Sequence, residues 1–254
     1  MRKHSILLAC LVIMATACKN KTEKTAGESA ENPKEMTKEV EQEETWTVLF
    51  DGTSFDGWHV YPDKPVPDTW KLEDGAMILR PSDVRKDGER FNMVTDREFT
   101  NFTLSLEWKV SEGANSGIMW GVKEDPKYKE PYYTGPEIQV LDNVGHPDAK
   151  NGTTHQAGSL YDMVAPSKDV VKPVGEWNQC VLTINHKTNE GIVVLNGEEI
   201  VRFPVNGEGW DKMVANSKFA DWEAFGKYST GKIALQDHGE KISIGYRNIK
   251  IKEL

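Results

Sequence analysis

Residues 102–110 alternate between apolar and polar side chains with near-perfect period two, and this pattern constrains the fold most strongly. The apolar positions are Phe102, Leu104, Leu106, Trp108 and Val110. Because successive side chains of a β-strand point to opposite faces, the alternation predicts a strand that buries one face and leaves the other polar. Half-buried strands of this kind are typical of antiparallel sheets.

Further segments have the composition of strands and are separated by turn sequences. They cover residues 76–79, 117–122, 137–141, 179–186, 191–195, 199–203, 232–236 and 241–254. The turn Asn196-Gly197 and a loop over Lys187–Gly191 predict a three-stranded meander. Helix signals are scarce, and only Asp211–Phe225 is expected to hold a short surface helix. Many short strands around one core predict an all-β fold, a two-sheet antiparallel β-sandwich, with jelly-roll connectivity preferred.

The first eighteen residues have the organisation of a bacterial lipoprotein signal. A basic start is followed by about ten apolar residues, too few to span a bilayer, and by small residues before Cys18. We therefore expect Cys18 to carry a lipid that anchors the exported chain to a membrane, on the periplasmic side, with the cell surface as the alternative. An ordinary cleaved signal with a chance cysteine is the alternative interpretation.

The rest of the chain divides into a polar segment and a folded domain. Residues 19–45 contain almost no large apolar side chains, so we expect a disordered tether between the signal (residues 1–18) and one domain over residues 46–254. Cys180 is the cysteine left after the signal and the lipid account for the others, and it is expected to be a core residue.

Charge and motifs exclude several classes of function. The formal net charge is −9, and an acidic chain repels the phosphates of nucleic acids, so nucleic acid is not an expected partner. The sequence contains no Gly-rich phosphate loop, CxxC pair or HExxH motif, so no cofactor is predicted. His146 and His155 flank a polar loop, but their spacing matches no established ligand pattern, and no metal is predicted.

A groove for a hydroxyl-rich ligand is predicted around residues 135–142. Alternation places Ile138 and Val140 toward the core and Glu137 and Gln139 on the opposite face. Glu107, Gln236 and His238 are candidates to converge there, and a sugar ring has candidate stacking partners in Trp120, Tyr132, Tyr133 and Tyr161. The alternative for each is an ordinary solvated or core side chain. From spacing alone, the prediction ends at an exported β-sandwich with a polar groove.

An ordered set of motifs resembles a known family, the 3-keto-disaccharide hydrolase domain of Bacteroidetes and related bacteria, and covers nearly all of residues 46–254. The opening motif is Leu49-Phe50-Asp51-Gly52-Thr53, followed by Phe55-Asp56-Gly57-Trp58. Later pieces include Asn115-Ser116-Gly117-Ile118, Gly135-Pro136-Glu137-Ile138-Gln139-Val140-Leu141-Asp142, Gly158-Ser159-Leu160-Tyr161, residues 231–239 and Arg247-Asn248-Ile249. The resemblance implies a concanavalin-like or laminin-G-like fold, in agreement with the sandwich predicted from alternation.

One segment departs from the family pattern. Where an aromatic pair and an arginine are expected after the Asn-Ser-Gly motif, this chain has Met119-Trp120-Gly121-Val122. If that arginine helps to hold the sugar, substrate preference differs here, and Trp120 is a candidate to stack on the sugar instead.

The resemblance implies a hydrolase that cleaves glycosidic bonds of 3-keto-sugars, after a separate sugar 3-dehydrogenase has oxidised the 3-hydroxyl. A ketone at C3 acidifies the hydrogen on C2, so the group on C1 can leave by elimination, and water can then add. This chemistry needs a base, an acid and donors for the developing enolate. We hypothesise that Glu137 and His238 are the acid–base pair, with the assignment of base and acid left open.

The other candidate residues are expected to bind substrate. Donors to the keto and hydroxyl groups are Asn115, Gln139, Gln236 and Arg247; Asp142 and Asp237 are weaker candidates, because alternation turns them away from Glu137. A conventional glycosidase using Glu107 and Glu137 is the rival enzyme, since such enzymes need two carboxyls across a cleft. A carbohydrate-binding module without catalysis is the alternative of another class.

Overall fold

A computed structural model describes residues 45–254 apart from 81–85 and 87. The predicted signal peptide, the lipid-bearing Cys18 and nearly all of the predicted tether therefore lie outside the described residues. Within the described part of the chain, no helix is long and apolar enough to cross a membrane.

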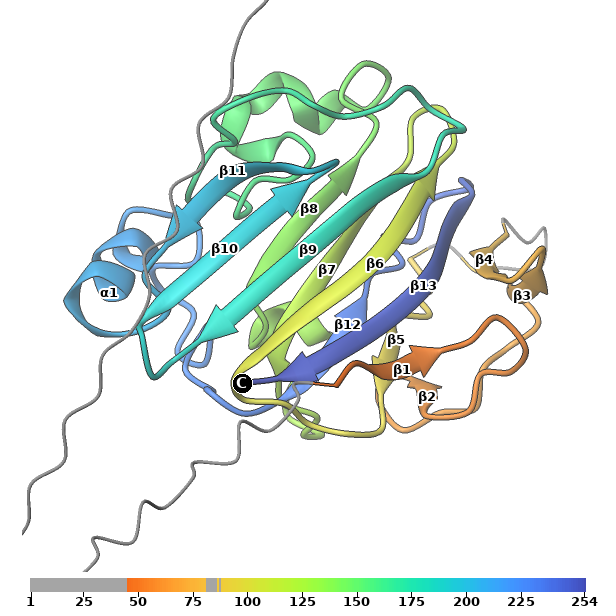
Figure 1. Cartoon of the computed structure of the whole chain (residues 1–254), viewed down its shortest axis with the longest axis horizontal. Helices are drawn as coiled ribbons and strands as arrows, with labels where there is room; N and C mark the ends of the chain where they lie inside the picture. Colours follow the sequence, from red (N-terminus) through yellow and green to blue (C-terminus); the bar gives the residue numbers. More distant parts are fainter. Residues whose placement is uncertain (1–44, 81–85, 87) are drawn as a thin grey trace, which may run out of the picture. The chain divides into compact units, whose positions relative to one another are not determined.

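The described residues form two antiparallel sheets packed face to face, as alternation predicted (Figure 1). The larger sheet has the order β11-β10-β9-β6-β13-β4-β3, with β1 paired to β13, and the smaller has the order β2-β5-β12-β7-β8. The strands of the larger sheet are β1 (Thr47–Phe50), β3 (Trp70–Glu73), β4 (Ala76–Leu79), β6 (Phe102–Val110), β9 (Asn178–Asn185), β10 (Glu190–Leu195), β11 (Glu198–Phe203) and β13 (Ile244–Glu253). Those of the smaller sheet are β2 (Trp58–Val60), β5 (Met93–Thr95), β7 (Asn115–Val122), β8 (Glu137–Leu141) and β12 (Lys232–Leu235).

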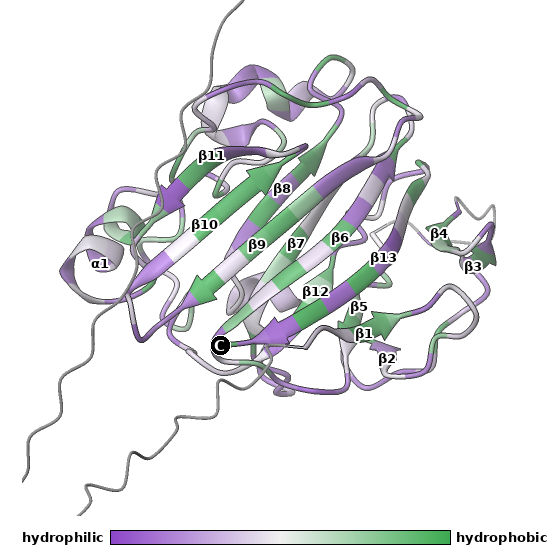
Figure 2. Ribbon diagram, viewed as in Figure 1, coloured by the Kyte–Doolittle hydropathy of each residue, from purple (hydrophilic) through white to green (hydrophobic). Residues whose placement is uncertain are grey.

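The core lies between the sheets. Along β6 the five apolar residues predicted to share a face are at most 4% exposed, and Figure 2 shows hydrophobic and hydrophilic residues alternating along β6 and β13. The predicted meander is confirmed, since β9 pairs with β10 and β10 with β11. Asn196 and Gly197 both have positive φ, as their hairpin turn requires. Cys180 is buried in this core, and its burial raises the pKa of the thiol to about 12, as expected of an inert residue.

The helical prediction was placed too far along the chain. Helix α1 spans Gly207–Ala215 rather than Asp211–Phe225, and three short 3-10 helices cover η1 (Pro131–Tyr133), η2 (Pro147–Asn151) and η3 (Thr153–His155). At the end of the α-helix, the Asn216 side-chain amide donates to the Lys212 carbonyl and the Ser217 hydroxyl donates to the Val214 carbonyl, which caps the last turn. The segment after α1 therefore continues as turns.

Candidate active site

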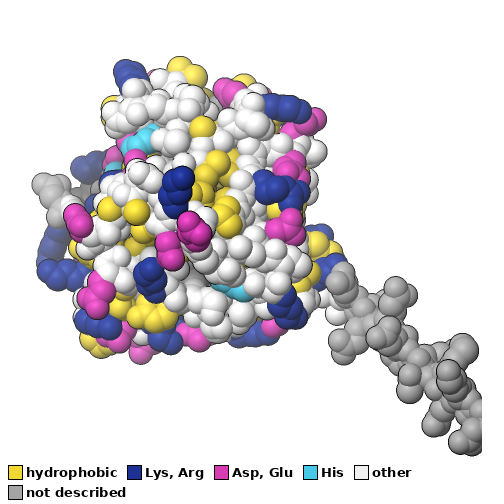
Figure 3. All heavy atoms as spheres, turned by 90° about the vertical axis from the view of Figure 1, so that its left-hand side faces the viewer, with side chains coloured by type: hydrophobic (Ala, Val, Ile, Leu, Met, Phe, Trp, Pro, Cys, Tyr) yellow, Lys and Arg dark blue, Asp and Glu magenta, His cyan; other side chains and the backbone are white. Residues whose placement is uncertain are grey.

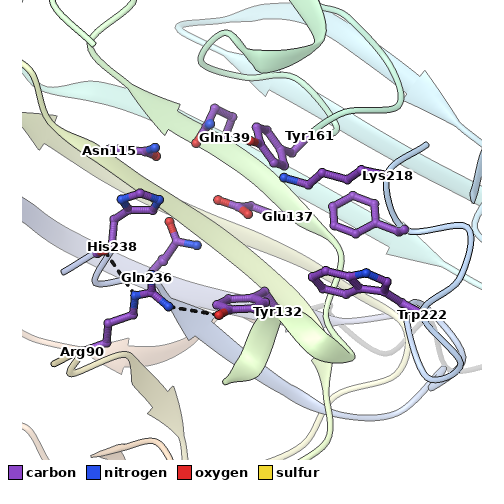
Figure 4. A pocket seen from close by; sticks show the side chains of 11 residues that line it. Arg90, Asn115, Tyr132, Glu137, Gln139, Tyr161, Lys218, Trp222, Gln236 and His238 are labelled. Carbon is purple, nitrogen blue, oxygen red and sulfur yellow. Dashed lines mark hydrogen bonds between the residues drawn. The ribbon is translucent and has the colours of Figure 1, made fainter. Parts of the chain in front are cut away.

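A pocket lies on the face of the smaller sheet that points away from the core. Its floor is formed by Asn115 from β7, Glu137 and Gln139 from β8, and Gln236 and His238 from the segment after β12. Its walls come from loops and add Arg90, Tyr132, Tyr161, Lys218, Phe219 and Trp222. Figure 4 shows Glu137, Gln236 and His238 directed toward a shared space, with Lys218 reaching in from the loop after α1.

Backbone pairing brings the floor residues together. On the side of β8 away from β7, the Tyr161 amide donates to the Glu137 carbonyl over 3.0 Å, so Tyr161 stands beside Glu137. The Gln236 amide donates to the Gly117 carbonyl over 2.9 Å, which extends the β12–β7 pairing and places Gln236 beside β7. Two strands and two extended segments thus supply the pocket with rigid, neighbouring side chains.

Glu137 is a buried carboxyl group without a hydrogen-bonding partner among the described residues. Its side chain is 7% exposed, and burial raises its pKa from the ordinary 4.5 to about 8. The positive charge of Lys218 opposes this shift, and the negative charge of Asp148 adds to it. A carboxyl with a pKa near neutrality is suited to move protons, because it is available in either state at physiological pH.

His238 is held in one orientation by Glu240. The His238 Nδ1 lies 3.0 Å from Glu240 Oε1, and the same oxygen lies 3.2 Å from His146 Nε2. His146 Nδ1 accepts a hydrogen bond from the Asp148 amide, so its proton is on Nε2 and is donated to Glu240. With Nδ1 of His238 engaged by the carboxylate, Nε2 is the ring nitrogen left for the pocket.

The pKa of His238 shifts in the opposite direction from that of Glu137. Burial lowers the pKa of His238 from 6.5, and the Arg90 charge adds to the shift, whereas Glu240 opposes it. Near pH 7 the environment therefore favours a neutral imidazole beside a protonated carboxyl group. Two groups whose environments drive their pKa values apart are the usual sign of an acid–base pair.

Two amide oxygens in the pocket are buried without partners. Asn115 Oδ1 and Gln236 Oε1 accept no hydrogen bond from the described residues. A buried unsatisfied acceptor costs roughly 1–3 kcal/mol, so each of these oxygens needs a donor from water or from a ligand. Sugar hydroxyls are donors of the required kind. The polar floor is thus prepared for a hydroxyl-rich molecule.

Lys218 and Tyr161 are positioned by a hydrogen-bonded network behind the pocket. Asp148 accepts from the Tyr161 hydroxyl over 2.9 Å, and His155 bridges Asp148 and Asp162 at 3.0 and 2.9 Å. Asp162 in turn accepts from the Lys218 amide, which places the Lys218 Nζ 4.0 Å from the centre of the Tyr161 ring. Burial acts against ionisation of Asp148, but hydrogen bonds from Asn151, Tyr161 and His155 lower its pKa. The network therefore holds a cation and an aromatic ring at the pocket wall.

The two histidines of the polar loop are both hydrogen-bonded to carboxylates. His146 pairs with Glu240, and His155 pairs with Asp148. Among residues 45–80, 86 and 88–254, no group of three or more His, Cys, Asp and Glu side chains is arranged to hold a metal ion.

Several residues predicted to bind substrate lie elsewhere. Glu107 and Arg247 form an ion pair of 2.7 Å on the larger sheet, where they belong to neighbouring strands. Alternation correctly turned Glu107 away from the core, but a sandwich has two outer faces, and Glu107 lies on the other one. The proposed carboxylate pair of Glu107 and Glu137 is therefore wrong, because its members belong to different sheets.

Trp120, Asp142 and Asp237 are also absent from the pocket lining. Trp120 is 4% exposed and packs against Phe203 with ring centres 5.8 Å apart, so it is a core residue and does not replace the missing arginine as a sugar platform. Asp142 accepts from the amides of Gly113 and Val144, and Asp237 from those of Phe91 and Gly239, so both hold loops in place. Of the predicted aromatic candidates, Tyr132 and Tyr161 do line the pocket.

Comparison with known proteins places the chain in a family. Residues 45–252 match the model of the 3-keto-alpha-glucoside-1,2-lyase-like domain. The chain belongs to this family. The family indicated by the motifs of the sequence is therefore confirmed.

Three similar proteins each cover more than four fifths of this chain. The 3-keto-disaccharide hydrolase of Bacteroides thetaiotaomicron is 36% identical over 233 residues, covering 82% of this chain and 78% of that protein. A crystal structure of a candidate glycosyl hydrolase from Parabacteroides distasonis is 31% identical with a TM-score of 0.75, covering 83% of this chain and 95% of that one. Another from the same organism, at 24% identity and a TM-score of 0.64, covers 83% of this chain and all of the other and supports the fold.

Some residues that line the pocket were not predicted from the sequence. Arg90 follows a segment without strand or helix periodicity, and it donates to the His238 carbonyl and the Tyr132 hydroxyl at 3.2 and 3.0 Å. Lys218 and Trp222 lie in the stretch predicted as a surface helix. The concentration of Phe219, Trp222 and Phe225 in that polar stretch was the available signal, because a solvated surface helix does not usually carry three large aromatic rings so close together.

Proposed function

We propose that the pocket cleaves the glycosidic bond of a 3-keto-sugar by elimination followed by addition of water. One observation carries the proposal: a buried carboxyl group, Glu137, and an oriented imidazole, His238, line the same pocket, and their environments shift their pKa values in opposite directions. The names of the family and of its Bacteroides relative support the same class of substrate.

The pKa shifts assign the two roles. His238 is neutral near pH 7 and acts as the base that removes the hydrogen from C2, using Nε2. Glu137 is protonated at that pH and acts as the acid that gives its proton to the glycosidic oxygen. Acid–base groups of this kind contribute about 10²–10⁴-fold each.

The reaction balances with water as the other reactant. Removal of the C2 hydrogen by His238 forms the enolate, and the C1–O bond breaks as Glu137 protonates the leaving oxygen, which gives a C1–C2 double bond conjugated with the ketone. The ionised Glu137 then takes a proton from water as the hydroxyl adds to C1. The imidazolium of His238, whose side chain is 38% exposed, exchanges its proton with water while the leaving alcohol departs, and it returns a solvent-derived proton to C2. The products are the free alcohol and the 3-keto-sugar, and both catalytic groups return to their starting states.

The remaining pocket residues stabilise and orient the substrate. The cationic side chains of Arg90 and Lys218 stabilise the negative charge that develops on the enolate oxygen. The unpartnered oxygens of Asn115 and Gln236 accept hydrogen bonds from sugar hydroxyls. Tyr161, fixed by Asp148, provides an aromatic wall.

The proposal is tested by offering the protein a 3-keto-disaccharide and its unoxidised parent. We expect cleavage of the keto-sugar alone, with losses of at least about a hundredfold in Glu137→Gln and His238→Ala. Glu107→Gln is the matched control, because it makes the same change on the other sheet, and its activity should stay near that of the wild type.

Other outcomes would identify the rival functions. Equal cleavage of both sugars would indicate a conventional glycosidase, and binding without cleavage would indicate a carbohydrate-binding module.

We also propose a cellular setting for this chemistry. The signal-like residues 1–18 support export and attachment through a lipid on Cys18, with the periplasmic side preferred. A ketone at C3 has to be introduced by an oxidation, so a separate sugar 3-dehydrogenase acts before this protein. Mass spectrometry of the mature N-terminus tests the lipid: a diacylated Cys18 is expected, and an unmodified N-terminus after signal cleavage would contradict it.

A further inference from the structure

A second pocket shares a wall with the candidate active site. Trp222 lines both pockets, and the second is otherwise lined by Tyr133, Lys127, Asp221 and Glu223 among others. The second pocket, here called the outer pocket, therefore begins where the active site ends.

Aromatic rings form the boundary between the pockets. The rings of Tyr132 and Tyr133 are centred 5.1 Å apart, and that of Trp222 lies 6.0 Å from Tyr132 and 5.2 Å from Tyr133. Tyr132 lines the active site, whereas Tyr133 lines the outer pocket. Tyr133 is 37% exposed, which is unusual for a large ring packed into a cluster. An exposed, rigid aromatic surface beside a catalytic pocket is a platform for a ligand.

The polar side chains of the outer pocket indicate the chemistry of its occupant. Asp221 and Glu223 are both exposed carboxylates, and Lys127 lies over the Tyr128 ring at 4.8 Å. Carboxylates accept hydrogen bonds from hydroxyl groups and repel anions. Figure 3 shows hydrophobic side chains exposed among acidic and basic ones on the face where α1 lies. Aromatic rings with acceptors at the rim fit a neutral sugar ring.

We infer that the outer pocket binds the uncharged sugar that leaves C1 of the substrate, with Tyr133 and Trp222 as its stacking surface. The inference rests on the proposed function, which places the oxidised ring beside Glu137 and His238. It adds a separate subsite for the leaving group and makes Tyr133 a specificity residue that does not touch the reacting atoms. Leaving groups with a carboxylate or phosphate are disfavoured by Asp221 and Glu223.

The test compares a 3-keto-disaccharide that has neutral glucose as its leaving group with the methyl 3-keto-glucoside. The methyl group is too small to reach the outer pocket. We expect Tyr133→Ala to raise KM for the disaccharide roughly three- to tenfold and to leave the methyl glucoside within about twofold of the wild type. Trp46→Ala is the control, because it removes another exposed aromatic ring, next to β1 in the sequence. It should leave KM unchanged for both substrates.

The outcomes separate the subsite from the proposed function. Equal changes for both substrates in Tyr133→Ala, or no change for the disaccharide, would overturn the subsite even if the wild type cleaves both. If the wild type cleaves neither substrate, the proposed function is overturned, and calorimetric titration of the wild type and Tyr133→Ala with the unoxidised disaccharide then tests the outer pocket by binding. Weaker binding to Tyr133→Ala than to the wild type would support the subsite, and equal binding would overturn it.

Discussion

Gly117 on β7 leaves the space that the Glu137 carboxylate occupies. A Cβ atom at Gly117 would overlap Glu137 Oε1 and the carbons next to it. The glycine belongs to the paired strand, where it stands opposite Gln139, the next residue on the same face as Glu137. A residue without a side chain on one strand thus allows a buried carboxyl group to lie flat against the sheet from the next.

Substitution of Gly117 tests this packing. Gly117→Ala should destabilise the protein by about 1–3 kcal/mol and displace Glu137, with a matching loss of activity. In a Glu137→Ala background the same substitution should cost much less, because the overlapping atoms are gone. Urea unfolding of the four proteins of this double-mutant cycle measures the coupling, and equal costs in both backgrounds would contradict the packing.

Glu137 should also make stability depend on pH. An acid whose pKa is higher in the folded than in the unfolded chain keeps its proton longer when folded, so stability falls as pH rises from about 4.5 to about 8. The full effect is on the order of 5 kcal/mol. Glu137→Gln should therefore match the wild type near pH 4 and be more stable at pH 8. An unfolding difference that does not grow across this range would show that the carboxyl is not desolvated.

The pH dependence of activity should show the titrations of both His238 and Glu137. Activity should fall on the acid side as His238 becomes charged, below 6.5, and on the alkaline side as Glu137 loses its proton, near pH 8. In the residual activity of Glu137→Gln the alkaline fall should disappear while the acid one remains. Loss of the acid limb in that variant would reverse the assignment of the two residues.

Substitution of Trp120 distinguishes a core residue from a sugar platform. Trp120→Ala should cost about 3–5 kcal/mol of folding stability, because it removes a large ring that packs on Phe203. KM for the keto-sugar, measured at a temperature where the variant remains folded, should stay unchanged. A raised KM without loss of stability would place Trp120 in the substrate site.

The sequence predicted the sandwich because its long strands have one buried face. The alternation of residues 102–110 and of Glu137–Leu141 is set by local geometry, and both strands were located correctly. Strands β1, β2, β3 and β5 were missed, since each has only three or four residues, too few to show a period. Strands β4 and β12 are equally short but were predicted, because each contains a run of apolar residues.

The candidate site was predictable only where one strand supplied it. Alternation on β8 places Glu137 and Gln139 together, and the structure puts both in the pocket. Alternation does not say which outer face of a sandwich a strand belongs to, so Glu107 was grouped with them wrongly. Arg90 and Lys218 arrive on loops, whose positions depend on contacts such as that between Asp162 and the Lys218 amide. Contacts between distant loops leave no periodic pattern of apolar and polar residues in the sequence, so they could not be predicted from it.

The fate of the hydrogen on C2 tests the central claim most directly. The wild type, His238→Ala and a protein-free control are incubated with a 3-keto-disaccharide in deuterated water, and the released 3-keto-sugar is examined by NMR. Elimination and hydration predict that the wild type releases a sugar with deuterium at C2, well ahead of the exchange in both controls. Release of a sugar that keeps its original C2 hydrogen would contradict the account.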